Sequence, residues 1–445
     1  MTQKAYLGTY LDKLQWSPER LARELNREHG PRTVSAKTPY GWLKGSFPRG
    51  QLPEFVAAIL SRKIGRTIEV NQIWPGRGDR DTFGAHDPAE TPWTQEQVIR
   101  ALRRLGQGAR GKPVHHTGGT LVSIAVDWLA ADGQQARPRN QGTRVTPRLA
   151  GVLAPRLAQL RELERTQHGL LLADWNNHDL RWVAHLLDEG SYDTVTGRLL
   201  YTTAAELAHN VGWLLTDQGR YAEGQHYELT ALRTAALARD RQLGAYVLSW
   251  LADHLTWYGR PQDALRLLAI ARTGVEETAS DALRALLAIR QALAHAQLGE
   301  ESACDAAAAE AAATPAGAGT PGWLRWFGPG VLLADTGRAW LKLGHFRRAE
   351  ELLASGLARL GEHRRRERLL YSAWLAEARL AIGELDGAVE LAHTALTLAE
   401  TVDSVRARRC LETLRRSFAG YDTAQVRAVV DRIRETGPLP QAPGC

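Results

Sequence analysis

The stretch LAHNVGWLLTDQGRYAEG, residues 207–224, places a glycine two residues before the bulky Tyr221 and five before a second glycine. Equivalent glycines follow at Gly259, Gly299, Gly344 and Gly383, so the successive intervals are 40, 40, 45 and 39 residues. Self-similarity at a period of about 20 to 50 residues indicates stacked units, each of which buries its apolar face against the next. Most of the chain is therefore expected to form a scaffold that binds something.

Each unit resembles a tetratricopeptide repeat, in which two antiparallel helices approach closely through small residues and a glycine ends the first helix in a left-handed backbone conformation. The first helices of such a stack line its concave face. Large polar and aromatic side chains there are candidate ligand contacts, although core packing is the commoner role for any single aromatic. The candidates are His209, Asn210, Trp213, His254, Trp257, Tyr258, Trp340, Tyr371 and Trp374.

The positive charge is confined to the start of the chain. Residues 1–80 hold 14 Lys and Arg against 7 Asp and Glu, whereas residues 81–445 hold 42 of each kind. A small basic module on a neutral body favours binding to nucleic acid, because each cation near a phosphate releases condensed counterions. A solvated basic face is the alternative, and charge alone does not separate the two.

Apolar spacing predicts four short helices in the first seventy residues, near 6–15, 18–30, 37–44 and 53–65. Ser17 is the expected N-cap of the second helix, with Pro18 at its first position. The second and third helices are arranged like a helix-turn-helix, in which the third would read the DNA groove. The candidate DNA contacts are Lys37, Thr38, Tyr40, Lys44, Arg49, Arg62, Lys63 and Arg66.

WSPERLARELN and TPYGWLKGSFPRGQLPEFVAAILSRKIGR resemble the helix-turn-helix domain of actinobacterial, Streptomyces-type regulators that carry a C-terminal tetratricopeptide-repeat domain. The resemblance continues through AAELAHNVGWLLTDQGRYAEGQ and GRPQDALRLL and covers nearly the whole chain. It implies a transcriptional regulator whose repeats receive a peptide or a small molecule. The matching N-terminal positions are Trp16, Ser17, Leu21, Ala22, Arg23, Asn26, Thr38, Trp42, Leu43, Gly45, Pro48, Arg49, Pro53, Ser61, Arg62, Gly65 and Arg66.

Pro39-Tyr40-Gly41 departs from the family pattern within the presumed reading helix. Proline and glycine both weaken helices, unless the proline lies in the first turn. An adaptor or antagonist with a degenerate helix-turn-helix that no longer binds DNA is therefore the alternative function.

Several other signals are interpreted without assigning chemistry to them. The three cysteines lack disulfide or zinc spacing, and no signal peptide or long apolar segment occurs, so a cytoplasmic protein without membrane contact is expected. No catalytic motif is present, so neither an enzyme nor a bound cofactor or metal is expected. His115-His116 is interpreted as a solvated loop and RRRER, residues 364–368, as a solvated face. WLRWF, residues 323–327, is expected to be a lid over the concave surface or a plug within it.

Together these observations predict an all-α protein with an N-terminal helix-turn-helix bundle followed by a right-handed tetratricopeptide-like α-solenoid. The expected domains are 1–75 for DNA binding, 76–147 as a linker with helical segments, 148–435 for the repeats and 436–445 as a disordered tail. The predicted function is a homodimeric regulator that binds double-stranded DNA and senses a peptide, a small molecule or a partner protein through its repeats.

Overall fold

The computed structural model describes residues 6–30, 33–44, 46–48, 52–64, 68, 70–74, 92–107, 113–131, 136–166, 169–314 and 319–436. These residues are predominantly α-helical, which confirms the expected all-helical class. A parallel pair of two-residue strands, β1 (Thr143–Arg144) and β2 (Gly190–Ser191), is the named sheet structure among them. The chain divides into two compact units, with described residues within 6–74 and 92–436 respectively. Arg49, Arg66 and residues 437–445 of the expected tail fall outside the described residues.

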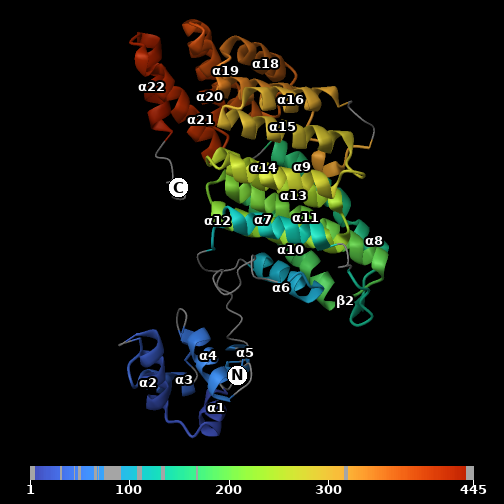
Figure 1. Ribbon diagram of the computed structural model, residues 1–445, viewed down its shortest axis with the longest axis vertical. Helices are drawn as coiled ribbons and strands as arrows, with labels where there is room; N and C mark the ends of the chain where they lie inside the picture. Colours follow the sequence, from blue (N-terminus) through green and yellow to red (C-terminus); the bar gives the residue numbers. More distant parts are fainter. Residues whose placement is uncertain are drawn as a thin grey trace. The chain divides into compact units, whose positions relative to one another are not determined.

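The first unit is a bundle of short helices (Figure 1). The helix expected at its second position begins as predicted, with Ser17 as N-cap accepting a hydrogen bond from the Arg20 amide at 3.3 Å and Pro18 as its first residue. The last helix, α5, was not predicted from the sequence. The helices are α1 (Leu7–Lys13), α2 (Pro18–His29), α3 (Thr38–Leu43), α4 (Leu52–Ile64) and α5 (Val70–Ile73).

Apolar side chains from every helix of this unit meet in one core. Leu21 and Leu25 of α2 and Ile59 and Leu60 of α4 are fully buried there. Trp42 of α3 packs edge-on against Trp74, with ring centroids 6.4 Å apart. The amide of Tyr6 donates to the carbonyl of Ile73 at 2.8 Å, which joins the two ends of the unit.

The second unit begins with helices that precede the sequence repeats. Among these, α6 packs against α10 and α12, and α7 packs against α14. Their bounds are α6 (Gln95–Gly106), α7 (Gly119–Ala130), α8 (Pro147–Gly151), α9 (Leu153–Thr166) and α10 (Leu170–Glu189).

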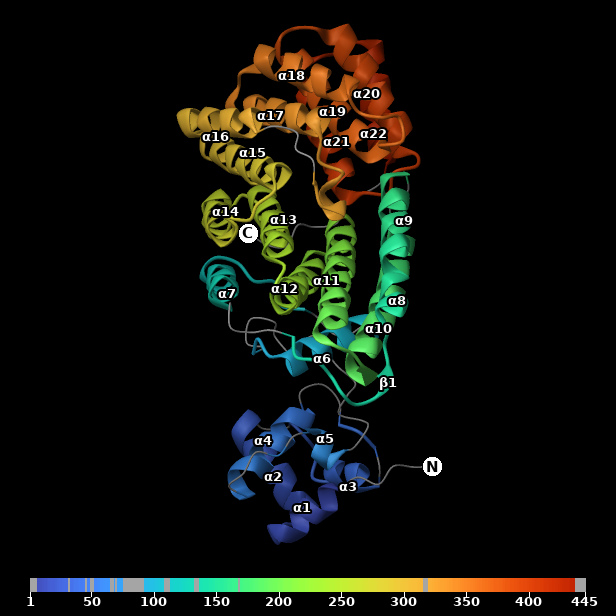
Figure 2. The ribbon, with the colours of Figure 1, turned by 90° about the vertical axis from the view of Figure 1, so that its right-hand side faces the viewer.

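The rest of this unit consists of successive helix pairs (Figure 2). In all but the last pair, the first helix packs closely against the helix that follows it. The pairs are α11 (Thr194–Asp217) with α12 (Tyr221–Ala238), α13 (Arg241–Trp257) with α14 (Pro261–Gly274), α15 (Asp281–Leu298) with α16 (Glu301–Ala313), α17 (Pro329–Leu343) with α18 (Phe346–Ala358), α19 (Arg365–Ala381) with α20 (Leu385–Ala399), and α21 (Val405–Ser417) with α22 (Ala424–Glu435).

The glycines that define the sequence period lie in the turns between the two helices of each of the first five pairs. All of them adopt left-handed backbone angles, which residues with a Cβ adopt only at a cost, and this confirms the expected role of the glycine. The φ values are 79° at Gly219, 75° at Gly259, 74° at Gly299, 85° at Gly344 and 88° at Gly383. Each second helix begins two residues after its glycine.

The loop that contains His115 and His116 packs against α12 within the second unit instead of being solvated. The backbone of His116 is held on both sides by the Gln225 side chain of α12, with hydrogen bonds of 2.7 and 2.9 Å. His116 is 8% exposed, and burial lowers the pKa of His115. The prediction of a solvated loop pair was wrong because a glutamine far away in sequence satisfies the loop backbone. Among the described helices, none has both the length and the apolar character needed to cross a lipid bilayer.

Candidate functional site

The first unit presents one face of α3 to solvent. Lys37, which precedes the helix, Tyr40 within it and Lys44 after it are exposed, whereas Pro39 and Trp42 are buried. Pro39 lies in the first turn, where its missing N–H removes no intrahelical hydrogen bond. The proline therefore leaves α3 intact, although the helix spans six residues.

Two of the sequence-predicted contacts on this face already have partners within the unit. The Tyr40 hydroxyl donates to the carboxylate of Glu19 on α2, which raises the pKa of Tyr40 and lowers that of Glu19. Thr38 Oγ1 accepts from the Ser35 amide at 3.2 Å. Both interactions tie α3 to its surroundings.

The remaining predicted contacts of the first unit lie at the end of α4. Arg62 forms an ion pair with Glu28 of α2, and Lys63 is exposed. Arg49 and Arg66 lie outside the described residues. Three exposed predicted cations form no ion pair with a described residue: Lys37, Lys44 and Lys63. Arg62 is exposed too, but it is paired with Glu28.

Asn26 fixes the segment between α2 and α3. Its side-chain amide donates to the Val34 carbonyl and its carbonyl accepts from the Val34 amide, each at 2.9 Å. This pair of hydrogen bonds satisfies the backbone N–H and C=O groups of Val34, which is buried. It also fixes the chain just before α3.

A cavity of about 340 Å³ lies within the second unit. Its wall draws on α9 and on the first helix of every pair, from α11 to α21, together with residues 322–326. The volume lies within the range of small-molecule sites, about 300 to 1,000 Å³. The residues that line this cavity are thus drawn from a long stretch of sequence, from Ala158 to Arg406.

The repeat spacing explains which side chains reach the cavity. Residues nine and six positions before each repeat glycine lie on one face of the first helix, because residues three apart are neighbours on a helix. Those that line the cavity are Asn210, Trp213, Trp250, Arg290, Asp335, Arg338 and Trp374.

Several arginines that line the cavity form ion pairs with buried carboxylates. Asp253 of α13 is 2% exposed and pairs with Arg290 at 2.6 Å and with Arg406 at 2.8 Å. Burial alone would raise the pKa of Asp253, but the two guanidinium groups hold it well below its ordinary value. Arg290 also approaches Asp335 of α17, at 3.9 Å. The cluster links α13, α15, α17 and α21 through charge.

Arg366 of α19 crosses to the carboxylate of Asp217 at the end of α11, with a distance of 3.0 Å from Nε to Oδ1. Its guanidinium also lies over the Trp213 ring, 5.3 Å from the centroid. Arg366 is 5% exposed, and Arg364 is partly buried and donates to the Trp326 carbonyl at 2.7 Å. The interpretation of residues 364–368 as a solvated face was therefore wrong, because distant acceptors compensate the buried guanidinium groups.

The WLRWF segment, residues 323–327, lies against the aromatic residues of α13. Trp323 stacks near Tyr246 with centroids 4.6 Å apart, and Trp326 lies 5.5 Å from Trp250. Trp326 Nε1 donates to the Tyr246 hydroxyl at 2.9 Å. The segment packs into the interior and forms part of the cavity wall at the same time.

The cavity brings together some of the ligand contacts predicted from the sequence. His209, Asn210, Trp213, Tyr371 and Trp374 line it. Trp257 instead lines a second cavity of about 700 Å³ that shares Arg338 and Trp374 with the first.

The other predicted ligand contacts line neither of these two cavities. Burial lowers the pKa of His254 to about 3, and its ring packs near Trp250. Tyr258 packs against Tyr221, with centroids 4.6 Å apart. Trp340 is 1% exposed, and Arg348 lies over its ring.

Sequence reasoning missed the cavity's arginines and the aromatic pair of Tyr246 and Trp250. The recurring positions before the repeat glycines would have found Trp250, Arg290 and Arg338. The distant pairing of Arg366 with Asp217 has no counterpart in that spacing.

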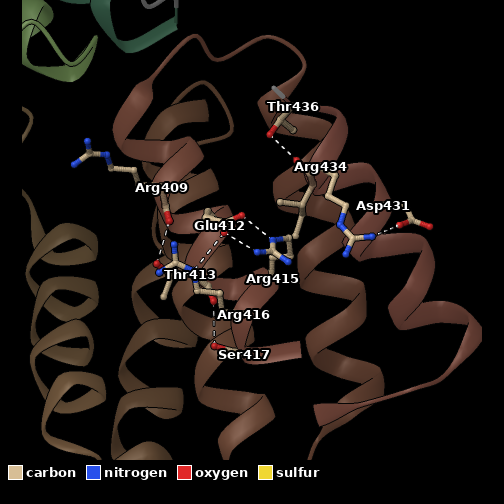
Figure 3. Close-up of polar contacts among 10 residues, drawn as sticks. Arg409, Glu412, Thr413, Arg415, Arg416, Ser417, Asp431, Arg434 and Thr436 are labelled. Atoms are coloured by element: carbon tan, nitrogen blue, oxygen red, sulfur yellow. Dashed lines mark hydrogen bonds and ion pairs between the residues drawn. The ribbon is translucent and has the colours of Figure 1, made fainter. Parts of the chain in front are cut away.

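Arg415 and Arg416 of α21 do not line the cavity, and Figure 3 shows both side chains directed to Glu412 on the same helix. Glu412 accepts two hydrogen bonds of 2.7 Å from Arg415 and one of 3.3 Å from Arg416 Nε. The hydrogen bonds from Arg415 lower the pKa of Glu412. Arg406 lies six residues before Glu412 and belongs to the cavity wall, so α21 carries arginines both in this wall and outside it.

Comparison with known proteins bears on the first unit. A family model described as the SP15 N-terminal domain matches residues 7–73, which run from the first residue of α1 to the last residue of α5. No curated protein matches the chain. The match supports treating α1 to α5 as one domain, and it covers well under half of the chain.

Proposed function

We propose that this chain is a cytoplasmic, DNA-binding transcriptional regulator. In this proposal α2 and α3 act as a helix-turn-helix, and the helix pairs form a right-handed tetratricopeptide-like α-solenoid that dimerises and senses a ligand. The observation that carries the DNA-binding role is the exposed face of α3, where Lys37, Tyr40 and Lys44 face solvent while Trp42 anchors the helix in the core.

The charge distribution supports this role. The first 80 residues carry an excess of 7 positive charges, and the rest of the chain is balanced. Such an excess binds phosphate by releasing counterions, whatever the base sequence. Tyr40 and Thr38 have polar groups suited to base edges or phosphates, but their present hydrogen bonds would have to be exchanged.

That requirement supports the alternative function, an adaptor or antagonist that does not bind DNA. The helix α3 is six residues long and contains Pro39 and Gly41, and Tyr40 is bonded to Glu19. A helix this short offers few side chains to a groove. The two functions differ in whether the exposed lysines contribute to DNA affinity.

Salt-dependent DNA binding by the full-length protein separates them. The triple variant Lys37→Ala, Lys44→Ala, Lys63→Ala is compared with wild type on a labelled 30-base-pair duplex by fluorescence anisotropy. Each lost phosphate contact should reduce the slope of log K against log salt by about 1. An unchanged affinity and slope would favour the adaptor.

A matched control removes the same charge from the second unit. Arg137, Arg148 and Arg347 are exposed there, and replacing all three with alanine changes the net charge equally. This variant should keep the wild-type slope, since a local contact depends on position. Equal losses in both triple variants would show a general charge effect and count against the proposed interface.

Dimerisation and specific recognition need a second measurement. DNA fragments bound in cells are recovered with wild type and with the Lys37, Lys44, Lys63 variant. A shared inverted repeat in the wild-type fragments is the expected result for a dimer with two half-sites. Fragments without enrichment would support the adaptor instead.

A further inference from the structure

The cavity of the second unit contains more positive than negative groups. Among the described residues, seven arginines and three carboxylates line it. Three further carboxylates compensate part of this excess, because Asp217 pairs with Arg366, Glu206 with Arg161, and Asp253 with Arg290 and Arg406. The remaining lining arginines are Arg364, which pairs with Glu367 at 3.5 Å, exposed Arg325, and Arg338.

Arg338 is the buried cation without an ion-pair partner. It is 9% exposed, lines the cavity, and makes no hydrogen bond or ion pair with a described residue. Its guanidinium lies over the rings of Trp257 and Trp374, at 5.1 and 4.8 Å from their centroids. Burial lowers the pKa of Arg338. Attraction by Asp253 and Asp335 opposes this shift, and repulsion by Arg406 adds to it.

Burying a guanidinium that makes no hydrogen bond or ion pair costs folding free energy. An anion bound in the cavity would reduce that cost. The planar guanidinium offers a fork of donors that matches the oxygen atoms of a carboxylate or a phosphate. Stacking on two indole rings restricts the plane of this fork. Arg338 is therefore arranged to receive two oxygen atoms of one ligand group.

The rest of the wall indicates what the anionic group is attached to. Trp213, Trp250 and Trp326 line the cavity together with Tyr246 and Tyr371. Aromatic rings prefer offset-stacked or edge-on contacts with other flat rings. The volume of about 340 Å³ lies within the range of small-molecule sites.

We infer that this cavity binds a small organic oxyanion, a carboxylate or phosphate carried on a planar ring, whose anionic group pairs with Arg338. The inference rests on the proposed sensing role of the second unit and names the ligand class for it. The ring lies among the tryptophans of α11, α13 and residues 322–326.

Calorimetric titration of the full-length protein tests the inference with four probes. These are 2-naphthoate, 2-naphthyl phosphate, the neutral 2-naphthamide and inorganic phosphate. One or both naphthyl anions should bind at least about tenfold more tightly than 2-naphthamide, as charge-assisted hydrogen bonds allow. The tighter anion distinguishes a carboxylate from a phosphate ligand, and no preference for either anion over the amide would overturn the inference.

The variant Arg338→Met assigns the preference to one side chain. It should lose the preference for anions and retain the affinity for 2-naphthamide. Retained anion preference would contradict the role given to Arg338.

Two further variants complete the test. Arg348→Met removes an arginine that lies over Trp340 outside the cavity, and it should leave all four affinities unchanged. Arg338→Lys keeps the charge but not the planar fork, so it should retain a weakened preference for anions. Equal losses in Arg348→Met and Arg338→Met would refute a local site. The assay contains no DNA, so anion binding and DNA binding succeed or fail separately.

Discussion

Arg366 and Asp217 are 149 residues apart in sequence and form a buried ion pair. Asp217 is the last residue of α11, and Arg366 lies in the first turn of α19. Side chains thereby connect an early helix pair of the second unit with a late one across the cavity wall. This contact joins α11 to α19 in addition to the packing between neighbouring helices.

Breaking this pair should destabilise the second unit strongly. Asp217→Ala leaves the Arg366 guanidinium buried without its carboxylate, and removing one partner of a buried pair costs about 3 to 5 kcal/mol. The expected result is a lower urea midpoint, followed by tryptophan fluorescence. The double variant Asp217→Leu, Arg366→Met should recover most of the loss, and an unaltered midpoint in Asp217→Ala would contradict the structural role.

Glu377 should make the stability of the second unit depend on pH. Burial raises the pKa of Glu377 from 4.5 to about 7, so the folded state favours the neutral carboxyl. The contribution of Glu377 to the free energy of unfolding is therefore greatest below pH 4.5. It falls as the pH rises from 4.5 through 7. Relative to Glu377→Gln, wild type should lose on the order of 3 kcal/mol between pH 4 and pH 8.

Thermal midpoints of wild type and Glu377→Gln, measured at the same series of pH values, check this prediction. The two midpoints should coincide near pH 4, separate progressively between pH 4.5 and 7 and stay apart by a constant amount above pH 7, with the glutamine variant the more stable. Glu351→Gln on α18 changes an exposed carboxyl and should show no such separation. Parallel midpoint curves for wild type and Glu377→Gln would refute the assignment.

Two glycines of the repeats should respond differently to one added methyl group. At Gly224 a Cβ would lie 2.6 Å from the Gly212 carbonyl oxygen and closer still to Thr216, so Gly224→Ala should cost about 3 kcal/mol. At Gly299 a Cβ meets nothing within 4 Å, and the cost is the left-handed angle alone, about 1 kcal/mol. Urea midpoints should rank wild type, Gly299→Ala and Gly224→Ala in falling order.

Asn26 should control the order of the segment that leads into α3. Asn26→Leu leaves both polar groups of Val34 without their partner, at a cost of about 1 to 3 kcal/mol. Amide hydrogen exchange in residues 33–44 should accelerate in this variant. Asn26→Asp keeps an acceptor for the Val34 amide and should accelerate exchange less; equal exchange in all three proteins would argue against this role.

Local patterns in the sequence predicted much of the fold. The apolar spacing of residues 6–15 and the cap at Ser17 correctly placed α1 and α2, because helix formation there depends on neighbouring residues. The repeat glycines marked the turns between paired helices, since a left-handed angle favours glycine wherever it occurs.

The chemistry of the cavity was not predicted, because it depends on contacts between distant segments. Charged side chains are rarely buried unless they are paired, so Arg366 was expected to be solvated like most arginines, and Arg290 was not singled out. Their partners Asp217 and Asp253 lie 149 and 37 residues away. Spacing within one helix shows which face a residue occupies, but it does not show what another helix places opposite.

The connection between α16 and α17 affects how the cavity of the second unit can change in evolution. It lengthens one repeat interval to 45 residues and contributes Trp323 and Trp326 to the interior, while α16 and α17 themselves remain ordinary members of their pairs. Insertions in repeat proteins vary without disturbing the stack. Substitutions in this one connection would therefore change which ligands fit the cavity without altering the helix pairs around it.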